Sequence, residues 1–213
     1  MRNPIQQDRI RNFFIDAAVA IVKNDGPEGL SARRIAKEAG YSYATLYNYF
    51  QDIDDLVFEC ICIFSNECQR FVSSECHDLQ PGIAAISAVC RAYVRFFLRN
   101  PGLFGLLFTR RISDSEQRKR LAAPTTGMFF QLTGEHWRFL IRNGQIDKDA
   151  ARRIDNQLLV SINGMLLLFL HQGYPRSFSE FVASLDESIE QILFSAQHIP
   201  AQAETLKVFS KAV

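Results

Sequence analysis

A short segment around residue 45 carries hydroxyl, amide and small side chains and contains no carboxylate. If Leu46 faces the protein interior, a helical rotation of about 100° per residue places Ala44 and Asn48 on the opposite side, flanked by Thr45 and Tyr47. Hydroxyl and amide groups donate hydrogen bonds to phosphate oxygens and read base edges in a major groove about 12 Å wide. The chemistry available to this segment is therefore recognition of duplex DNA.

The residues before this segment supply a helix and a sharp turn that would hold it in place. Ser31 is a typical helix-starting residue, because its hydroxyl accepts a free N–H of the first turn. Ile35, Ala36 and Ala39 share one face, and the two alanines let another helix approach closely. Gly40 permits the positive φ that an abrupt turn requires. The pattern predicts a helix-turn-helix, although helix pairs of this kind also occur in proteins that bind no DNA.

The second helix is expected to begin at Ser42 and to turn Leu46 and Phe50 inward. Thr45 or Asn48 would read base edges, while neighbouring hydroxyl and guanidinium groups hold the DNA backbone. The candidate DNA-binding residues are Ser31, Arg33, Arg34, Ser42, Tyr43, Ala44, Thr45, Tyr47, Asn48 and Tyr49.

Helical periodicity continues along the rest of the chain, with no strand-type alternation and no internal repeat. Asp52 is a good N-cap for a helix that leaves the helix-turn-helix, and the basic stretch 110–120 is expected to form a solvated loop. An aromatic helix is expected from about Thr125 to Arg142. The sequence predicts an all-α fold of about nine helices. A homeodomain-like three-helix domain would span residues 1–55, and a larger helical domain residues 56–213.

Composition bounds the class of protein. The 213 residues are 47% hydrophobic and 22% charged, with a formal net charge of +1. Because overall charge gives no attraction to DNA, binding would depend on a local basic patch. No signal segment opens the sequence, and no apolar run approaches the roughly 20 residues that cross a bilayer. We therefore expect a cytoplasmic protein with no membrane partner.

Patterns typical of catalysis or metal binding are missing from the sequence. It has no Gly-rich phosphate loop, no HExxH and no Ser-His-Asp or Cys-His order, so an enzyme is not expected. The five cysteines are an odd number for a disulfide framework and lie mostly in helical patterns, which favours reduced thiols. No paired Cys or His spacing suits zinc, so neither a metal nor a cofactor is expected.

About 50 contiguous residues near the N-terminus closely resemble the DNA-binding domain of the tetracycline-repressor family. Its signature is an apolar helix with paired alanines, then G…T…IA…AG[VY]S…TLY.YF, then an acidic helix start. The matching residues are Ala17-Ala18, Gly26, Ser31, Ile35-Ala36, Ala39-Gly40-Tyr41-Ser42, Thr45-Leu46-Tyr47, Tyr49-Phe50 and Leu56. The resemblance implies a ligand-responsive transcriptional regulator, most often a repressor, whose homodimer binds a palindromic operator.

One position departs from the family pattern. The family usually places a lysine three residues after the final Phe, where it meets a phosphate, whereas this chain has Ile53. The loss of one phosphate contact would make the salt dependence of binding shallower by about 0.9 in the log–log slope. The departure leaves open an alternative, a helical small-molecule-binding dimer whose helix-turn-helix does not function.

The resemblance also implies that the helices after residue 56 form a dimerising domain. Two regular apolar stripes near the C-terminus could pair with the same stripes of a second subunit in a four-helix bundle, or could instead pack inside their own chain. The candidate dimer-interface residues are Leu158, Ile162, Phe169, Phe181, Leu185, Ile189 and Ile192.

The same domain is expected to bind a small-molecule inducer. Eighteen phenylalanines and one tryptophan would suit an apolar or aromatic ligand, although each is also an ordinary core residue. Asn163, in an otherwise apolar helix, is the polar group expected to face the cavity. The candidate ligand-binding residues are Phe64, Phe97, Phe104, Phe108, Phe130, Trp137, Asn163 and Met165.

Overall fold

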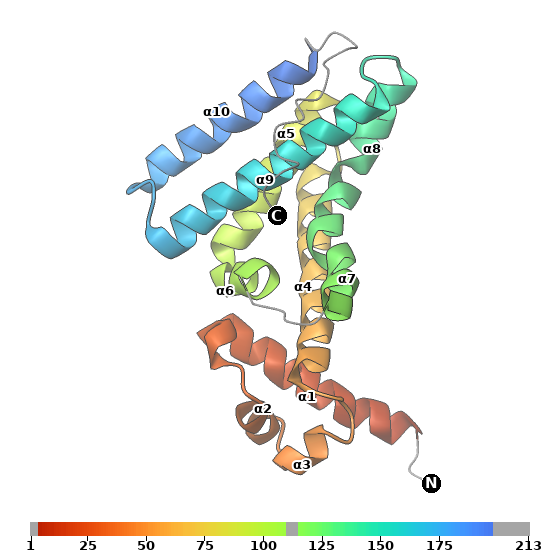
Figure 1. Ribbon diagram of the computed structural model, residues 1–213, viewed down its shortest axis with the longest axis vertical. Coiled ribbons are helices and arrows are strands. Elements are labelled where there is room, and N and C mark those ends of the chain that lie inside the picture. Colours follow the sequence, from red (N-terminus) through yellow and green to blue (C-terminus); the bar gives the residue numbers. More distant parts are fainter. Residues whose placement is uncertain (1–3, 110–114, 198–213) are drawn as a thin grey trace, which may run out of the picture.

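Two helical units share one long helix, α4 (Ile53–Cys76), which starts in the smaller unit and runs through the larger one (Figure 1). The computed structural model describes residues 4–109 and 115–197, apart from the side chains of 115–118 and 196–197. Within these ranges the chain forms helices and no strand, which confirms the predicted all-α class. The predicted domain boundary after residue 55 falls within the first turn of α4.

The smaller unit consists of α1 (Pro4–Asp25), α2 (Ala32–Glu38), α3 (Tyr43–Leu46) and the start of α4. Phe14, Ile35, Leu46 and Phe50 are almost completely buried at its centre, and the rings of Phe14 and Phe50 meet edge to face. Phe13, beside Phe14 on α1, is by contrast 46% exposed. Burial of these side chains removes apolar surface from water and fixes the short α3 against the longer α1.

Two ion pairs fasten α1 across α4. Arg11 Nη2 lies 2.6 Å from Glu59 Oε1, and Lys23 Nζ lies 2.9 Å from Glu67 Oε1. The Arg11 guanidinium also lies over the Phe50 ring, 5.0 Å from its centroid. These contacts join the first half and the last turn of α1 to the helix that enters the larger unit, so the smaller unit and α4 are held together.

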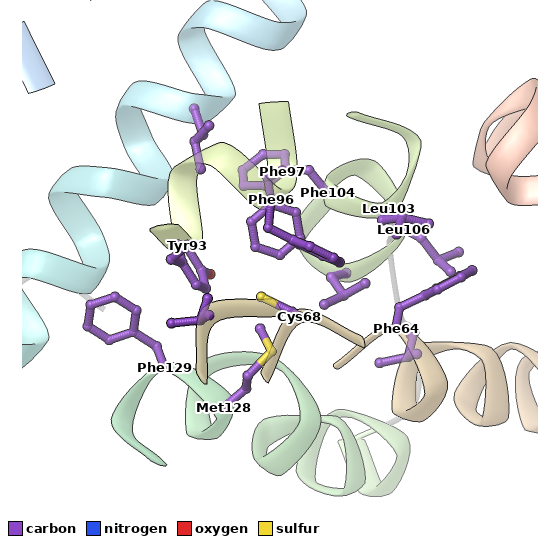
Figure 2. Packing of buried hydrophobic residues seen from close by; sticks show 14 of the residues in the cluster. Phe64, Cys68, Tyr93, Phe96, Phe97, Leu103, Phe104, Leu106, Met128 and Phe129 are labelled. Carbon is purple, nitrogen blue, oxygen red and sulfur yellow. The ribbon is translucent and has the colours of Figure 1, made fainter. Parts of the chain in front are cut away.

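The larger unit packs α4 against α5 (Ile83–Arg99), α8 (Met128–Arg142) and α9 (Lys148–Gln172). Aromatic rings fill its interior: Tyr93 contacts Phe97 and Phe129 edge to face, and Phe97 contacts Phe104 in the same way (Figure 2). Phe104 belongs to the short α6 (Pro101–Phe104), which continues as a π-helical turn over Gly105–Thr109. This interior is an apolar core that reaches the base of α6.

The basic stretch at 110–120 is helical in part, contrary to the predicted loop. Residues 110–114 lie outside the described part of the chain, and α7 (Ser115–Ala122) follows them. A π-helical turn at Ala123–Gly127 connects α7 to α8, so α8 starts three residues later than expected. Arg120 holds α7 against α4. Its guanidinium lies 4.3 Å from the Phe58 ring centroid and 3.7 Å from Asp55 Oδ1, and both residues belong to α4.

The chain ends its described part with an antiparallel pair, α9 and α10 (Phe178–Gln197), which lies on the side of the larger unit away from α7 (Figure 1). The rings of Phe169 and Phe181 stack with centroids 4.3 Å apart. Among the described helices, α9 alone is long and apolar enough to cross a membrane by length and composition. Within the larger unit α9 contacts α5, α8 and α10, and 33% of its most apolar stretch is buried.

Candidate nucleic-acid interface and ligand groove

The turn between α2 and α3 is built as the sequence predicts. Ser31 Oγ accepts the Arg34 N–H at 3.3 Å and so caps α2. Gly40 has φ +76°, and the N–H groups of Gly40 and Tyr41 donate to the carbonyls of Lys37 and Ala36. This Schellman arrangement ends α2, and the left-handed conformation favours glycine. The turn therefore fixes the angle at which α3 leaves α2.

The outward face of α3 is small and polar. Ala44 and Asn48 are exposed, whereas Leu46 is fully buried, as the helical rotation predicted. Ser42 Oγ accepts the Thr45 N–H at 3.1 Å and lies 2.8 Å from Thr45 Oγ1, so these two hydroxyls share one hydrogen bond. The tip of the smaller unit presents no carboxylate between residues 42 and 50.

Two tyrosines form a paired rim beside that face. Tyr43 is 49% and Tyr47 41% exposed, their ring centroids are 5.0 Å apart and their hydroxyl oxygens 3.2 Å apart. The hydrogen bond with Tyr43 raises the pKa of Tyr47, so the phenol stays protonated and can donate. One hydroxyl proton is engaged in this mutual hydrogen bond, and the other remains to donate to an approaching anion.

The two arginines of α2 differ in their surroundings. Arg33 is exposed. Arg34 is paired with Asp25 at the end of α1, which ties its guanidinium to the smaller unit. Arg33 is therefore the better candidate for a phosphate contact, and Arg34 holds α2 against the end of α1.

Tyr49 does not fit its predicted role as a DNA contact. Its hydroxyl is buried and has no hydrogen-bond partner among the described groups, and its ring lies against Phe14 with centroids 6.1 Å apart. A rotation of about 100° per residue already places Tyr49 only about 60° from the buried Leu46. The turn over residues 47–49 keeps Tyr49 on that inward side.

Ile53 stands at the first position of α4, directly after the N-cap Asp52, whose Oδ1 accepts the Asp55 N–H at 2.7 Å. The Ile53 side chain is half-buried and packs against the core of the smaller unit. The position that would carry a cation in the resembling family therefore contributes apolar packing here.

The predicted ligand-binding residues fall into two places. Phe64, Phe97 and Phe104 are fully buried in the core (Figure 2). Phe108 lies against Phe97 and Phe104, with ring centroids 5.8 Å and 5.1 Å away. Asn163 and Met165 are half-buried on α9. Asn163 Oδ1 accepts a hydrogen bond from the Tyr93 hydroxyl at 3.2 Å, a partner that the sequence did not indicate.

Phe130 and Trp137 lie elsewhere, in an open groove of about 840 Å³ between α8 and α9. Phe130 is 37% exposed and Trp137 is 5% exposed. The groove, hereafter the α8/α9 groove, is lined by Phe130, Gly134, Trp137, Ile141, Lys148, Asp149, Ala151, Arg152, Arg153, Asp155 and Asn156. Phe130 still touches the aromatic core through Phe129, whose ring centroid is 6.3 Å away, so the groove lies at the edge of that core.

The predicted dimer stripes are also corrected. Within the single chain six of the seven residues are at most 7% exposed, and Phe169 is half-buried, because α9 and α10 pack on each other and on α5. The buried residues are Leu158, Ile162, Phe181, Leu185, Ile189 and Ile192. The apolar side chains that these helices do expose are Val160, Leu167, Leu168, Phe178 and Phe194.

Comparisons with known proteins give a consistent result. Residues 14–60 match the family model described as bacterial regulatory proteins, tetR family. Residues 86–193 match the model described as tetracyclin repressor-like, C-terminal domain. The two matches cover the smaller unit and most of the larger one.

Individual relatives are more distant. An uncharacterized HTH-type transcriptional regulator of Haemophilus influenzae is 26% identical over 120 residues, which span 56% of this chain and 58% of that protein. The structure of FadR from Bacillus subtilis in complex with stearoyl-CoA superposes with a TM-score of 0.68 at 18% identity, covering 88% of this chain and 99% of that one. FadR from Bacillus halodurans gives 0.67 at 15% identity, covering 93% and 100%. At these identities the solved structures show a shared fold.

Proposed function

The chain belongs to the tetR family of bacterial regulatory proteins, and from this premise we propose that it is a ligand-responsive repressor that binds operator DNA as a dimer. The observation that supports this proposal is the exposed face of α3. Ala44 and Asn48 point outward there, hydroxyl groups flank them, and the face carries no carboxylate. A face of this kind enters a major groove without repulsion from phosphates. The protein acts in the cytoplasm, where operator DNA is found.

The contacts divide by role. Tyr43, Tyr47 and Arg33 surround α3 and supply neutral or cationic donors for the DNA backbone, which position the helix. Asn48 and Thr45 are the side chains for base edges, and Ala44 leaves room for close approach. With a net charge near zero, these local donors carry the affinity.

Dimerisation follows from the apolar side chains that α9 and α10 leave exposed. Val160 is 64% and Leu167 43% exposed, and they lie seven residues apart on one face of α9. Pairing with the same face of a second copy would bury this surface around a two-fold axis. Two copies of α3 would then address the two half-sites of a palindrome.

The effect of a bound ligand would pass to the DNA-binding unit through α6 and the residue that follows it. Gly105 packs against Pro27, since a Cβ built there would lie 3.2 Å from Pro27 Cγ, and Gly102 lies against the end of α1. An apolar or aromatic small molecule in the larger unit would displace α6 and with it the smaller unit. The small molecule binds the displaced arrangement more tightly and DNA binds the original arrangement more tightly, so each ligand weakens binding of the other. The FadR structure with stearoyl-CoA shows that this fold accommodates a ligand with a long apolar chain.

A mobility-shift experiment with DNA from upstream of the protein's own gene tests the proposal. We expect a specific shift that weakens between low and high salt, since displaced counterions oppose binding. A matched variant, Asn48→Asp, places a carboxylate on the outward face and should abolish the shift while leaving the fold intact. Equal binding by Asn48→Asp, or no specific shift by the unaltered protein, would contradict a DNA-binding role and favour the alternative of a small-molecule-binding dimer.

A further inference from the structure

The α8/α9 groove has a buried carboxylate at its floor. Asp155 is 7% exposed, and Thr133 Oγ1 lies 2.8 Å and 3.0 Å from its two oxygens. In the described part of the chain, no lysine or arginine forms an ion pair with it. One hydroxyl has a single proton to donate, so most of the carboxylate's hydrogen-bonding capacity is unused.

The Trp137 indole N–H lies beside this carboxylate. It is buried and reaches no full hydrogen-bond geometry with a described group, but it lies close enough to Asp155 to act as a donor that lowers the pKa of the acid. Buried polar atoms are normally hydrogen-bonded, and a weakly placed donor leaves the carboxylate open to a further partner. A buried acid and a buried donor therefore lie together at the floor of an open groove.

The rest of the groove is largely apolar. Phe130, Trp137, Ile141 and Ala151 supply its walls, and Gly134 leaves space that a side chain would otherwise occupy. Its volume of about 840 Å³ is in the range of pockets for small organic molecules. The walls thus suit an aromatic or aliphatic body, and the floor suits a polar head.

The sign of that head follows from where the charges are. Lys148, Arg152 and Arg153 also line the groove, but they are exposed and solvated, so their attraction for an anion is weak. Asp155 is desolvated and unpaired, and a cation placed against it would gain far more. We propose that the α8/α9 groove binds an organic amine, with its ammonium group on Asp155 and its apolar body between Phe130 and Trp137.

The inference gives the inducer of the proposed regulator a chemical class, and in this respect it rests on the proposed function. Binding itself does not depend on DNA. The chain has a single tryptophan, Trp137, so its fluorescence reports occupancy of this groove alone. Failure to bind the amine and failure to bind DNA can therefore be observed separately.

The test uses three matched probes: 3,3-diphenylpropylamine, 3,3-diphenylpropanol and 3,3-diphenylpropionic acid. We expect the amine to change Trp137 fluorescence saturably and to bind at least tenfold more tightly than the alcohol or the acid. Asp155→Asn, which can still hydrogen-bond Thr133, should weaken amine binding at least tenfold. Glu135→Gln, an exposed acid on α8 outside the groove, should leave it unchanged.

A second variant tests the location independently of Asp155. Gly134→Leu fills the groove, where an added Cβ meets only Arg138 Nη1 at 3.8 Å, and should weaken the amine at least tenfold without unfolding the protein. Equal affinity for the three probes, tighter binding of the acid, or undiminished amine binding by Asp155→Asn or Gly134→Leu would overturn the proposal. A mobility shift with and without the amine then reports separately whether the occupied groove affects DNA binding.

Discussion

Gly102 lies directly against the main chain of Val22: a Cβ at Gly102 would come 2.9 Å from the Val22 carbonyl oxygen. The same atom would lie 3.2 Å from Gly26 Cα. The Val22 oxygen also accepts the Gly26 N–H at 3.0 Å, so it belongs to the rigid end of α1. Only glycine allows α6 to approach α1 this closely.

Replacement of Gly102 by alanine should therefore separate α6 from α1. Overpacking against main-chain atoms costs about 1–3 kcal/mol, which denaturant unfolding should show as a lower free energy of unfolding. Gly134→Ala on α8 is the matched control, since its Cβ has space and alanine favours a helix interior by about 1 kcal/mol. Equal effects of the two variants on stability would show that the α6–α1 contact is not tight.

Loss of the hydroxyl should affect DNA affinity at one tyrosine of the helix-turn-helix and thermal stability at the other. Tyr47→Phe removes an exposed donor and should weaken operator binding about fivefold, corresponding to about 1 kcal/mol for one hydrogen bond. Tyr49→Phe removes a buried hydroxyl that has no described partner, so it should leave affinity unchanged and raise the melting temperature. Fluorescence anisotropy with labelled operator and thermal unfolding give both results. A loss of affinity in Tyr49→Phe would show that this residue reaches the DNA.

Restoring the family's cation should make DNA binding more salt-dependent. Ile53→Lys places an ammonium at the start of α4 and should steepen the slope of log affinity against log salt by about 0.9. Ile53→Met keeps an apolar side chain and is the control. If Ile53→Lys binds no better at low salt and shows the original slope, this position does not lie near a phosphate.

A charge on the exposed face of α9 should prevent dimerisation. Leu167→Arg and Val160→Glu each place a charged group where the proposed two-fold pairing needs apolar contact. Analytical ultracentrifugation should then show monomers, and operator affinity should fall because only one half-site can be engaged. Phe139→Glu alters an equally exposed aromatic residue on α8 and should remain dimeric. Dimers of Leu167→Arg would place the interface elsewhere.

The stability of the protein should depend on the charge of Asp155. Burial raises the pKa of this carboxyl to about 6, against about 3.9 in an unfolded chain, so the folded state holds its proton more tightly. Stability from this group is therefore present at low pH and is lost as the pH rises from about 4 to about 6, by about 3 kcal/mol at most. Cys90, the titratable neighbour on α5, stays protonated because burial raises its pKa as well.

Asp155→Asn isolates this effect. The variant should melt at a higher temperature than the unaltered protein at pH 7, and the difference should shrink below pH 5, where the acid is protonated in the folded state. Thermal unfolding across this pH range is the measurement. A variant that is less stable than the parent at pH 7 would mean that the ionised carboxylate is paired in solution.

Local periodicity accounts for what could be predicted from the sequence. Leu46 faces inward and Ala44 faces outward because both lie in the single turn of α3, where rotation per residue is constant. Phe50 follows four residues after Leu46, and its N–H donates to the Leu46 carbonyl, so it lies on the same inward side. Tyr49 was included among the DNA contacts for its hydroxyl, although a rotation of about 100° per residue places it only about 60° from the buried Leu46. Caps such as Ser31 and Ser42 were correct because they depend on side chains and main-chain groups three residues apart.

Long-range packing could not be inferred in the same way. An apolar stripe indicates that a helix face is covered, but it does not show whether the cover comes from the same chain or from a second copy. Leu158 and Ile189 are therefore buried inside one chain although they were expected at a dimer interface. The sequence did not identify Asp155 as a candidate site residue, because its surroundings are formed by Thr133 and Trp137, which lie on another helix.

Because α4 is long, the ion pairs that join it to α1 can convert a small tilt of α4 into a large movement of the smaller unit. Its 24 residues extend roughly 36 Å at about 1.5 Å per residue. Because Glu59 and Glu67 fasten α1 to this rod, the smaller unit swings with it as one piece. A tilt of roughly 5° about the far end moves the near end by about 3 Å, close to the rise of about 3.4 Å per base pair along the duplex axis. A tilt of α4 that is too small to rearrange the core would therefore shift the DNA-binding unit by about one base pair relative to its operator.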